Sequence, residues 1–365
     1  MLRQMRLLAG GAMLAGSLIV SHDAAAETAP LAANKPVAAI KGAAPQIDDA
    51  VLAAFKPGLQ DAIPAEDNAL TKEKIDLGRM LYYETRISKN QKISCNTCHL
   101  LDKYGVDGTP TSTGHKNQKG GRNAPTVYNA AGHVAQFWDG RAPTVEEQAK
   151  GPVLNPIEMA MASKEEVIAV LGSMPGYVDA FNKAFPNEKE PLSYDNFGKA
   201  VGAFERKLVT PSRFDKFIHG DKTALNAEEI KGLQTFVTTG CIACHSGPYV
   251  GGKMFQKVGL VKPWPGVKDL GRYEVSKGEG DRHVFKVPSL RNITKTAPYL
   301  HDGSVDKLED QVRLMARHQL AKELGDDDVK SILAFLGALT GELPADYIKP
   351  PKLPESGAKT PAPAE

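Results

Sequence analysis

The sequence has few cysteines, no late apolar run long enough to cross a membrane, and almost no excess of one charge. Its 365 residues include four cysteines, and none of them lies outside two short motifs. The formal net charge is +2, of which +1 falls on the first 26 residues, so nothing indicates binding to nucleic acid or another polyanion. No apolar segment after residue 20 reaches the length of a membrane span. Alternating, strand-like patterns are also scarce, which argues against a mainly β protein.

The four cysteines form two copies of one pattern, Cys95-Asn96-Thr97-Cys98-His99 and Cys241-Ile242-Ala243-Cys244-His245. Two intervening residues let both sulfurs reach the two vinyl groups of one porphyrin, and the adjoining histidine can ligate the iron. A zinc site made from both cysteine pairs, or two redox-active disulfides, would not require a histidine after each second cysteine. The sequence therefore predicts two covalently attached c-type haems.

The N-terminus has the features of an export signal. Arg3 and Arg6 precede an apolar, Gly- and Ala-rich run over residues 7–20, and three alanines at 24–26 follow. This pattern predicts a secretory signal peptide over residues 1–26. The alternative is an uncleaved anchor, for which the apolar stretch is short. Covalent haem attachment takes place outside the bacterial inner membrane, so the motifs and the predicted export agree. We expect a periplasmic protein.

The chain that remains is long enough for two domains. Removing the predicted signal leaves 339 residues, and the two haem motifs begin 146 residues apart, so each marks one domain. The boundary is predicted near Thr210-Pro211-Ser212. The predicted organisation is a flexible segment at 27–46, an N-terminal haem domain at 47–208, a C-terminal haem domain at 209–349, and a Pro-rich tail at 350–365. The composition of both end segments predicts mobile tails.

Apolar residues between these tails repeat with helical periodicity. Ser163, with Glu166 three residues later, predicts the start of an amphipathic helix. Asn226 and Glu229 repeat the device, and Gly240 is expected to end that helix just before the second haem motif. A later stripe predicts one more helix: Val329, Ile332, Leu333, Leu336 and Leu339. The fold is predicted to be mainly α, with two cytochrome c-like haem domains and long connecting loops.

Two of those loops, at residues 105–122 and 246–280, are expected to supply the second axial side of the irons. His99 and His245 fill one axial position each, and the ligand on the other face decides between catalysis and electron transfer. The candidates are the other histidines and methionines of the mature chain: His115, His133, His219, His283, His301, His318, Met80, Met159, Met161, Met174, Met254 and Met315. Spacing alone does not choose among them.

Several segments together resemble the bacterial di-haem cytochrome c peroxidases. They are Thr111-Ser112-Thr113-Gly114-His115, Asn123-Ala124-Pro125-Thr126-Val127, Gln136-Phe137-Trp138-Asp139-Gly140-Arg141, Asn155-Pro156-Ile157-Glu158-Met159, Val287-Pro288-Ser289-Leu290-Arg291-Asn292 and Thr296-Ala297-Pro298-Tyr299-Leu300-His301-Asp302-Gly303. The resemblance covers nearly the whole mature chain, with both haem motifs in register. It implies reduction of hydrogen peroxide with electrons from a small periplasmic cytochrome c or cupredoxin, and it implies a homodimer.

The resemblance also implies the axial ligands. The haem on His99 would be the low-potential, peroxidatic one, with His115 as its removable distal ligand. Met315 would be the distal ligand of the haem on His245. A thioether raises the potential of haem iron and a second imidazole leaves it lower, so electrons would enter at the His245 haem. Without the resemblance, Met315 would be interpreted as a core residue on a stripe with Leu308 and Val312.

Further site residues come from the same resemblance. Glu158 would be the acid–base glutamate that moves a proton between the peroxide oxygens, Gln148 would orient the peroxide, and Trp138 would lie between the haems. The ordinary interpretations are an exposed helix-start carboxylate, a solvated amide and an aromatic that fills the domain interface. The resemblance also places Ca²⁺ at the interdomain oxygens of Asn123, Thr296 and Pro298.

Two other functions fit the haem motifs. A di-haem electron carrier would keep both irons firmly six-coordinate and would not need Glu158. A related di-haem enzyme oxidises tryptophans of a partner protein, and a tyrosine there replaces the methionine on the second haem. Methionine at position 315 argues against that alternative.

Overall fold

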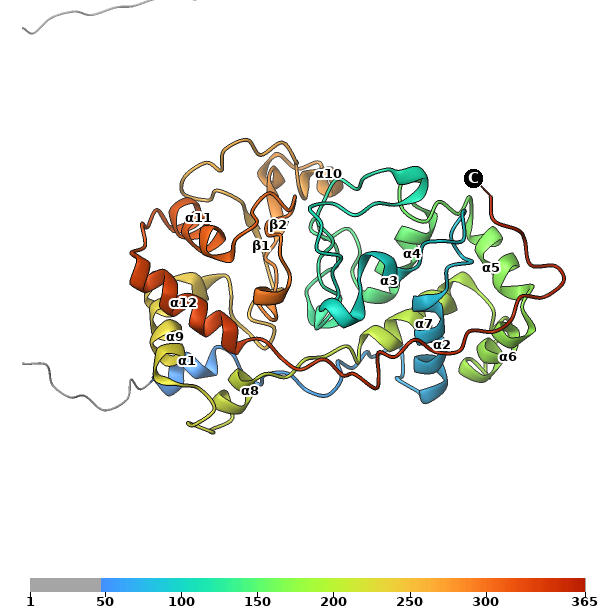
Figure 1. Ribbon diagram of the computed structural model, residues 1–365, viewed down its shortest axis with the longest axis horizontal. Coiled ribbons are helices and arrows are strands. Elements are labelled where there is room, and N and C mark those ends of the chain that lie inside the picture. Colours follow the sequence, from blue (N-terminus) through green and yellow to red (C-terminus); the bar gives the residue numbers. More distant parts are fainter. Residues whose placement is uncertain (1–46, 365) are drawn as a thin grey trace, which may run out of the picture. The chain divides into compact units, whose positions relative to one another are not determined.

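The computed structural model describes residues 47–364, so the predicted signal peptide at 1–26 and the segment at 27–46 lie outside the described residues. Helices predominate in the described part (Figure 1). Its sheet structure consists of one antiparallel pair, β1 (Phe255–Lys257) and β2 (Val284–Lys286), together with isolated bridges. The prediction of a mainly α fold is confirmed.

Five helices build the first hydrophobic core: α2 (Lys72–Tyr83), α4 (Val145–Leu154), α5 (Lys164–Gly172), α6 (Pro175–Ala184) and α7 (Tyr194–Glu205). Helix α7 packs against both α2 and α4. A Cβ on Gly78 of α2 would lie 1.9 Å from the carbonyl oxygen of Ala200 and 2.9 Å from the Cβ of Phe204. The two helices therefore cross at a distance that only glycine permits.

The second core is built by α1 (Asp49–Ala53), α8 (Arg213–Ile218), α9 (Ala227–Thr239), α11 (Leu308–Leu320) and α12 (Asp326–Ala338). Helices α9 and α12 cross in the same way as α2 and α7. A Cβ on Gly232 would lie 1.9 Å from the carbonyl oxygen of Ser331 and 2.9 Å from the Cβ of Phe335. Each half thus has one glycine-mediated crossing between the helix that precedes its haem motif and a later helix.

Short elements lie in the connections between these helices. They are α3 (Cys95–Cys98), α10 (Tyr273–Ser276) and the 3₁₀ turns η1 (Leu101–Lys103), η2 (His115–Asn117), η3 (Ala130–Gly132), η4 (Cys241–Ala243), η5 (Glu279–Asp281) and η6 (Ile293–Lys295). The segment at 246–280, predicted as a loop, therefore contains β1 and α10.

The predicted helix signals are found in the structure. The Ser163 hydroxyl accepts the backbone N–H of Glu166 at 3.2 Å, which starts α5. Asn226 and Glu229 cap each other at the start of α9, with both contacts at 2.9 Å. Gly240 ends α9 with a φ of 101°, in the left-handed region that favours glycine. Helix α12 follows at the predicted place, with its apolar stripe mostly buried.

The C-terminal segment, including the predicted Pro-rich tail, contacts the first half. After α12 the chain runs back over the first half, past α7 and α2 toward α5 and α6 (Figure 1). The Tyr347 ring stacks on Phe204 with centroids 5.0 Å apart, and its hydroxyl donates to the Phe204 carbonyl at 2.8 Å. Arg86 donates to the Pro354 carbonyl at 2.8 Å. Proline carbonyls still accept hydrogen bonds, so a segment with few N–H groups is fixed by donors from the first half.

Packing at both ends of the described chain crosses the predicted domain limits. Leu52 and Phe55, which come early in the sequence, are buried in the second core. Ile348, which comes late, is buried in the first core. The domain limits 47–208 and 209–349 remain a prediction. The segment with Leu52 and Phe55 packs on the second half and the segment with Ile348 packs on the first half, so both segments cross these limits.

Candidate functional site

Both Cys-x-x-Cys-His motifs line one cavity of about 850 Å³. The lining residues from the motifs are Cys95, Cys98, His99, Cys241, Cys244 and His245. Cys95 packs against the first core and Cys241 against the second, so the cavity lies where the two halves meet. Residues 146 positions apart in the sequence therefore share one site.

Each motif forms one helical turn, in which the backbone of the histidine is hydrogen-bonded to that of the first cysteine. The backbone N–H of His99 donates to the Cys95 carbonyl at 3.0 Å, and that of His245 donates to the Cys241 carbonyl at 3.0 Å. In the first motif, the Ser94 N–H also donates to the Thr97 hydroxyl at 2.9 Å, which fixes the start of α3. The two motifs share the hydrogen bond from the histidine to the first cysteine, although the first motif forms the α-helical turn α3 and the second the 3₁₀ turn η4.

The side chains of His99 and His245 are half-buried, and desolvation favours their neutral form. Burial lowers the pKa of His99 below its ordinary value and lowers that of His245 to about 4. The His99 Nδ1 lies 3.3 Å from the Gly105 carbonyl oxygen. The His245 Nδ1 is buried and makes no hydrogen bond of full geometry within residues 47–364, although the backbones of Val250 and Pro288 lie near the ring. Neutral imidazole is the form that ligates metal, so both rings suit an axial ligand.

The cysteines fit thioether attachment better than zinc or disulfides. All four are free, and burial raises the pKa of the Cys95 thiol and raises that of Cys241 to about 11. Zinc sites use thiolates held close together. In the described part of the chain, no group of three or more His, Cys, Asp or Glu side chains is arranged to hold a metal ion. With two cysteine pairs on different cores around one large cavity, the donor set fits two porphyrins.

Glu158 and Gln148 line the cavity on its first-half side. Gln148 belongs to α4, and Glu158 lies in the non-helical segment after it. Burial raises the pKa of Glu158 above its ordinary value, while Arg141 and the amide of Asn155 oppose the shift; Asn155 donates to the carboxylate at 2.8 Å. The interpretation of Glu158 as an exposed helix-start carboxylate does not fit, because the residue is half-buried and outside any helix.

His115 is buried, and its backbone contacts that of Glu158. Gly114 lines the cavity, whereas His115 is not among the described residues that line it. Its backbone N–H lies 2.9 Å from the carbonyl oxygens of both Ile157 and Glu158. A Cβ on Gly114 would lie 2.0 Å from the Ile157 oxygen, so this contact requires glycine. The His115 Nδ1 is buried without a partner among the described residues. Its role as an iron ligand stays a prediction.

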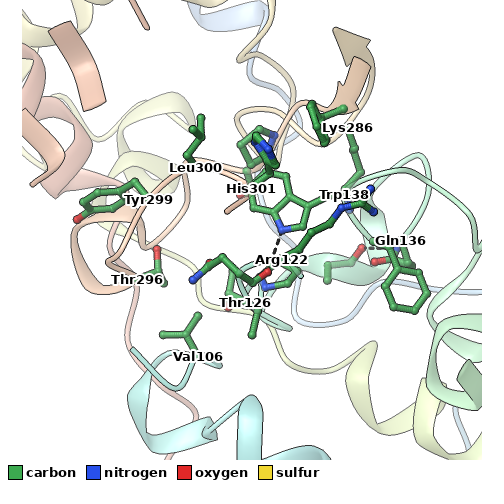
Figure 2. A pocket seen from close by; sticks show the side chains of 18 of the residues that line it. Val106, Arg122, Thr126, Gln136, Trp138, Lys286, Thr296, Tyr299, Leu300 and His301 are labelled. Atoms are coloured by element: carbon green, nitrogen blue, oxygen red, sulfur yellow. Dashed lines mark hydrogen bonds between the residues drawn. The ribbon is translucent and has the colours of Figure 1, made fainter. Parts of the chain in front are cut away.

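Trp138 joins segments of the two halves. Its indole N–H donates to the Asn123 carbonyl at 2.9 Å, and its ring meets the His301 ring edge-on at 6.4 Å (Figure 2). The Asn123 N–H in turn donates to the His301 carbonyl at 2.8 Å. The predicted packing role at the interface is observed. A role in electron transfer stays a prediction.

The three predicted calcium ligands line the cavity together: Asn123, Thr296 and Pro298. The Asn123 amide nitrogen donates to the carbonyls of Thr109 at 2.9 Å and Pro110 at 3.3 Å. The amide oxygen of Asn123 therefore faces away from these two carbonyls and accepts no hydrogen bond within residues 47–364. Amide and carbonyl oxygens are ligands that Ca²⁺ accepts, so the donor set fits the predicted ion.

Met315 lies on α11, and the stripe that it forms with Leu308 and Val312 lines the cavity. The interpretation of Met315 as an ordinary core residue is therefore incomplete, because the stripe faces the space next to the second motif. A thioether in this place fits the predicted distal ligand of the iron on His245, which stays a prediction.

Arg122 and Lys286 are charged residues of the site to which the sequence patterns assign no role. Arg122 donates to Asp139 at 2.5 Å and to Asp269 at 2.6 Å, which ties the loop at 105–122 to the second half. The Lys286 ammonium is buried, donates to the Ala135 carbonyl at 2.8 Å, and has its pKa lowered to about 8 by burial. Their partners are 147 and 151 positions away, so local sequence patterns could not reveal them.

Comparison with known proteins gives a consistent result. The family described as "Di-haem cytochrome c peroxidase" matches residues 72–223. The cytochrome c551 peroxidase of Pseudomonas aeruginosa is 45% identical over 324 residues, which cover 87% of this chain and 93% of that protein. The cytochrome c551 peroxidase of Nitrosomonas europaea is 48% identical, covering 80% of this chain and 88% of that protein.

Among solved structures, the fold resembles a MauG-like protein associated with microbial copper homeostasis. The TM-score is 0.72 at 28% identity, and the match covers 81% of this chain and 98% of that one. No helix within residues 47–364 has both the length and the apolar character needed to cross a membrane.

Proposed function

This chain belongs to the di-haem cytochrome c peroxidase family, and from that premise we propose that it reduces hydrogen peroxide to two molecules of water. Two electrons and two protons are consumed, and the electrons come one at a time from a small cytochrome c or cupredoxin. The chain is an oxidoreductase that acts on peroxide. The observation that carries the proposal is a desolvated carboxyl, Glu158, in the one cavity that both Cys-x-x-Cys-His motifs line.

The two haems would be held by the two motifs and would supply the iron that exchanges electrons with donor and peroxide. Cys95 and Cys98 would attach the first porphyrin and His99 would ligate its iron. Cys241, Cys244 and His245 would do the same for the second. Met315 on α11 would complete the second iron and raise its potential above that of an iron between two imidazoles.

Glu158 would move the proton that peroxide cleavage requires. The O–O bond breaks heterolytically when the proton leaves one oxygen and reaches the departing one, so the base must also serve as an acid. A carboxyl with a raised pKa holds a proton closer to neutrality than an ordinary glutamate. The Asn155 amide fixes one carboxylate oxygen, and the Gln148 amide on α4 would orient the peroxide.

His115 would be the removable second ligand of the iron on His99. Its backbone is hydrogen-bonded to the carbonyls of Ile157 and Glu158, so a movement of His115 would also shift the segment that carries the catalytic carboxyl. The loop at 105–122 has several glycines and can move without repacking a helix. Its far end is anchored by Arg122 to Asp269 of the second half, which gives the second half a direct contact with this loop.

Trp138 and calcium would connect the two halves. The indole lies between segments of both halves and offers a π-system on the path between the two motifs. Ca²⁺ on Asn123, Thr296 and Pro298 would hold the carbonyl and amide oxygens of both halves together. The predicted signal peptide places the enzyme in the periplasm, and we expect a homodimer.

The proposal is tested by mixing the purified holoenzyme with calcium, a reduced small cytochrome c or cupredoxin, and hydrogen peroxide. We expect oxidation of two donor molecules for each peroxide consumed. A di-haem electron carrier would oxidise the donor without consuming peroxide, and that result would overturn the proposal. The fold also resembles a solved MauG-like structure, but the two peroxidase relatives are more similar in sequence, at 45% and 48% against 28% identity.

A further inference from the structure

A second buried carboxyl lies in the same cavity and takes no part in the proposed mechanism. Glu205 is the last residue of α7, and 4% of its surface is exposed. It lines the cavity together with Cys95, the first cysteine of the haem motif on the first core. A glutamate that is this deeply buried normally has a hydrogen-bond or ion-pair partner.

Glu205 has no such partner in the described part of the chain. No group within residues 47–364 donates a hydrogen bond to its carboxyl, and no ion pair includes it. The neighbouring cation, Arg206, is turned away from it. The Arg206 guanidinium donates to Glu146 at 2.7 and 3.0 Å and to the Pro64 carbonyl at 2.9 Å. The nearest positive charge is therefore used by another carboxylate.

The groups that face Glu205 come from every element packed around it. They are Tyr82 of α2, Cys95 of α3, Glu146 of α4, Arg206 after α7 and Tyr347 of the C-terminal segment. Arg206 is the one cation of this set, and Glu146 adds a repulsive negative charge. Burial first, and then Glu146, raise the pKa of Glu205 to about 8, while Arg206 opposes the shift.

We propose that Glu205 is a redox-linked proton site of the haem attached at Cys95 and Cys98. When the iron loses one electron, Glu205 releases one proton to solvent; when the electron returns, the proton returns. Oxidation adds one positive charge to the buried haem, and the new carboxylate compensates for that charge. In a low-dielectric cavity two such charges interact strongly, because few water molecules screen them. The proposal needs the haem at this position but does not depend on peroxide turnover.

Glu205 differs from Glu158 in its surroundings. The Glu158 carboxylate accepts a hydrogen bond from Asn155 and is influenced by Arg141, so it has partners that stabilise its charged form. Glu205 accepts no such hydrogen bond, and the cation that influences it, Arg206, is hydrogen-bonded to Glu146 instead. The protonation of Glu205 can therefore change with the charge of the nearby haem. The carboxylate of Glu158, in contrast, is positioned by Asn155 for its proposed contact with the substrate.

The test is a redox titration of the purified holoenzyme, with no peroxide and no donor protein present. The potential of the first haem is measured from about pH 6 to pH 10 in the wild type, Glu205→Gln, Glu205→Asp and Glu158→Gln, a range that brackets the expected titration. We expect the wild-type potential to fall with rising pH around pH 8, by at most one proton per electron. Glu205→Gln should lose this dependence, Glu205→Asp should retain it over a shifted range, and Glu158→Gln should retain it.

The second haem in the same molecule is the internal control, because Glu205 lies on the first core. An unchanged pH dependence of the first-haem potential in Glu205→Gln would overturn the proposal, and so would a flat wild-type profile. If Glu205→Gln does not fold, redox difference infrared spectra of the wild type decide. They should show the C=O band of a protonated carboxylic acid disappearing on oxidation, and its absence would overturn the proposal. None of these outcomes depends on peroxidase activity.

Discussion

The two halves of this molecule carry the same covalent motif in different chemical surroundings. Each has a Cys-x-x-Cys-His turn, a backbone hydrogen bond of 3.0 Å from the histidine to the first cysteine, and a glycine-mediated crossing of two helices. The first half adds two carboxyl groups without a cationic hydrogen-bond partner, Glu158 and Glu205. The second half adds the thioether of Met315 on an apolar helix face.

This difference indicates that the Cys-x-x-Cys-His pentapeptide determines which cofactor is bound. The residues around each haem then determine which chemistry that haem can support. The acids that the second half contributes to the cavity lining are Asp269 and Glu274, and both are paired with Arg122. The cavity-lining carboxyl groups that have no cationic partner therefore lie in the first half alone. A sulfur ligand with hydrocarbon neighbours suits a centre that passes electrons without proton chemistry.

The largest expected effect comes from removing Glu158, the proposed acid–base group of the first half. Glu158→Gln keeps the shape of the side chain and removes its ability to shuttle a proton. We expect the peroxidase turnover to fall by about 10²- to 10⁴-fold, the usual contribution of general acid–base catalysis. Steady-state kinetics measure the loss, and absorption spectra should show both haems unchanged.

The matched control is Glu147→Gln, because Glu147 belongs to α4 but points to solvent. This variant should keep wild-type turnover. Near-normal turnover in Glu158→Gln would remove the functional contrast between the two halves.

The unpaired carboxyl of Glu205 should also appear in the pH dependence of stability. Its folded-state pKa of about 8 exceeds the ordinary value of 4.5, so folding takes up a proton between these pH values. The free energy of unfolding of the wild type should therefore fall as the pH rises from about 4.5 to about 8. Glu205→Gln should lack this decline and should be more stable at pH 7, by on the order of 3 kcal/mol. Denaturant unfolding at pH 5 and pH 7 measures the difference, and equal pH profiles would contradict the account.

Calcium should stabilise the contact between the halves. If the ion binds the folded protein alone, calcium at 100 times its Kd should stabilise the fold by about 2.7 kcal/mol. Thermal unfolding with calcium and with a chelator measures this shift. Asn123→Ala should abolish it, because Asn123 provides the side-chain ligand among the three predicted positions. A calcium shift that survives in Asn123→Ala would place the ion elsewhere.

The smallest expected effect tests whether the C-terminal segment belongs to the first half. Tyr347→Phe keeps the ring stacked on Phe204 and removes one hydrogen bond to the Phe204 carbonyl. We expect a loss of about 1 kcal/mol in the free energy of unfolding, the typical net value of one hydrogen bond. An unchanged stability would show that the stacking alone holds the segment.

The sequence predicted those features that depend on neighbouring residues. The haem motifs, the caps at Ser163 and Asn226, and the end of α9 at Gly240 all arise within a few residues, so local patterns identify them. The resemblance to a family supplied Glu158, Gln148 and Met315, which the structure places in the cavity.

Features that depend on partners distant in the sequence could not be predicted from local patterns. Arg122 binds Asp269 across 147 positions, and Arg206 binds Glu146 across 60. Glu205 has no ion-pair partner in the described part of the chain because Arg206 binds Glu146 instead. No local sequence pattern could therefore show that Glu205 is unpaired. The composition of the Pro-rich tail at 350–365 could not reveal its distant partners in the first half, such as Arg86, which donates to the Pro354 carbonyl.

The most direct test of the contrast between the halves is the spin state of each haem in the calcium-loaded enzyme before and after one-electron reduction. The account predicts that both haems are low-spin when fully oxidised, and that a high-spin signal from the His99 haem appears once the His245 haem is reduced. His115→Ala should show that high-spin signal without reduction, because it lacks the proposed removable ligand. If the half-reduced wild type keeps both haems low-spin and six-coordinate, the peroxidatic role of the first half is contradicted.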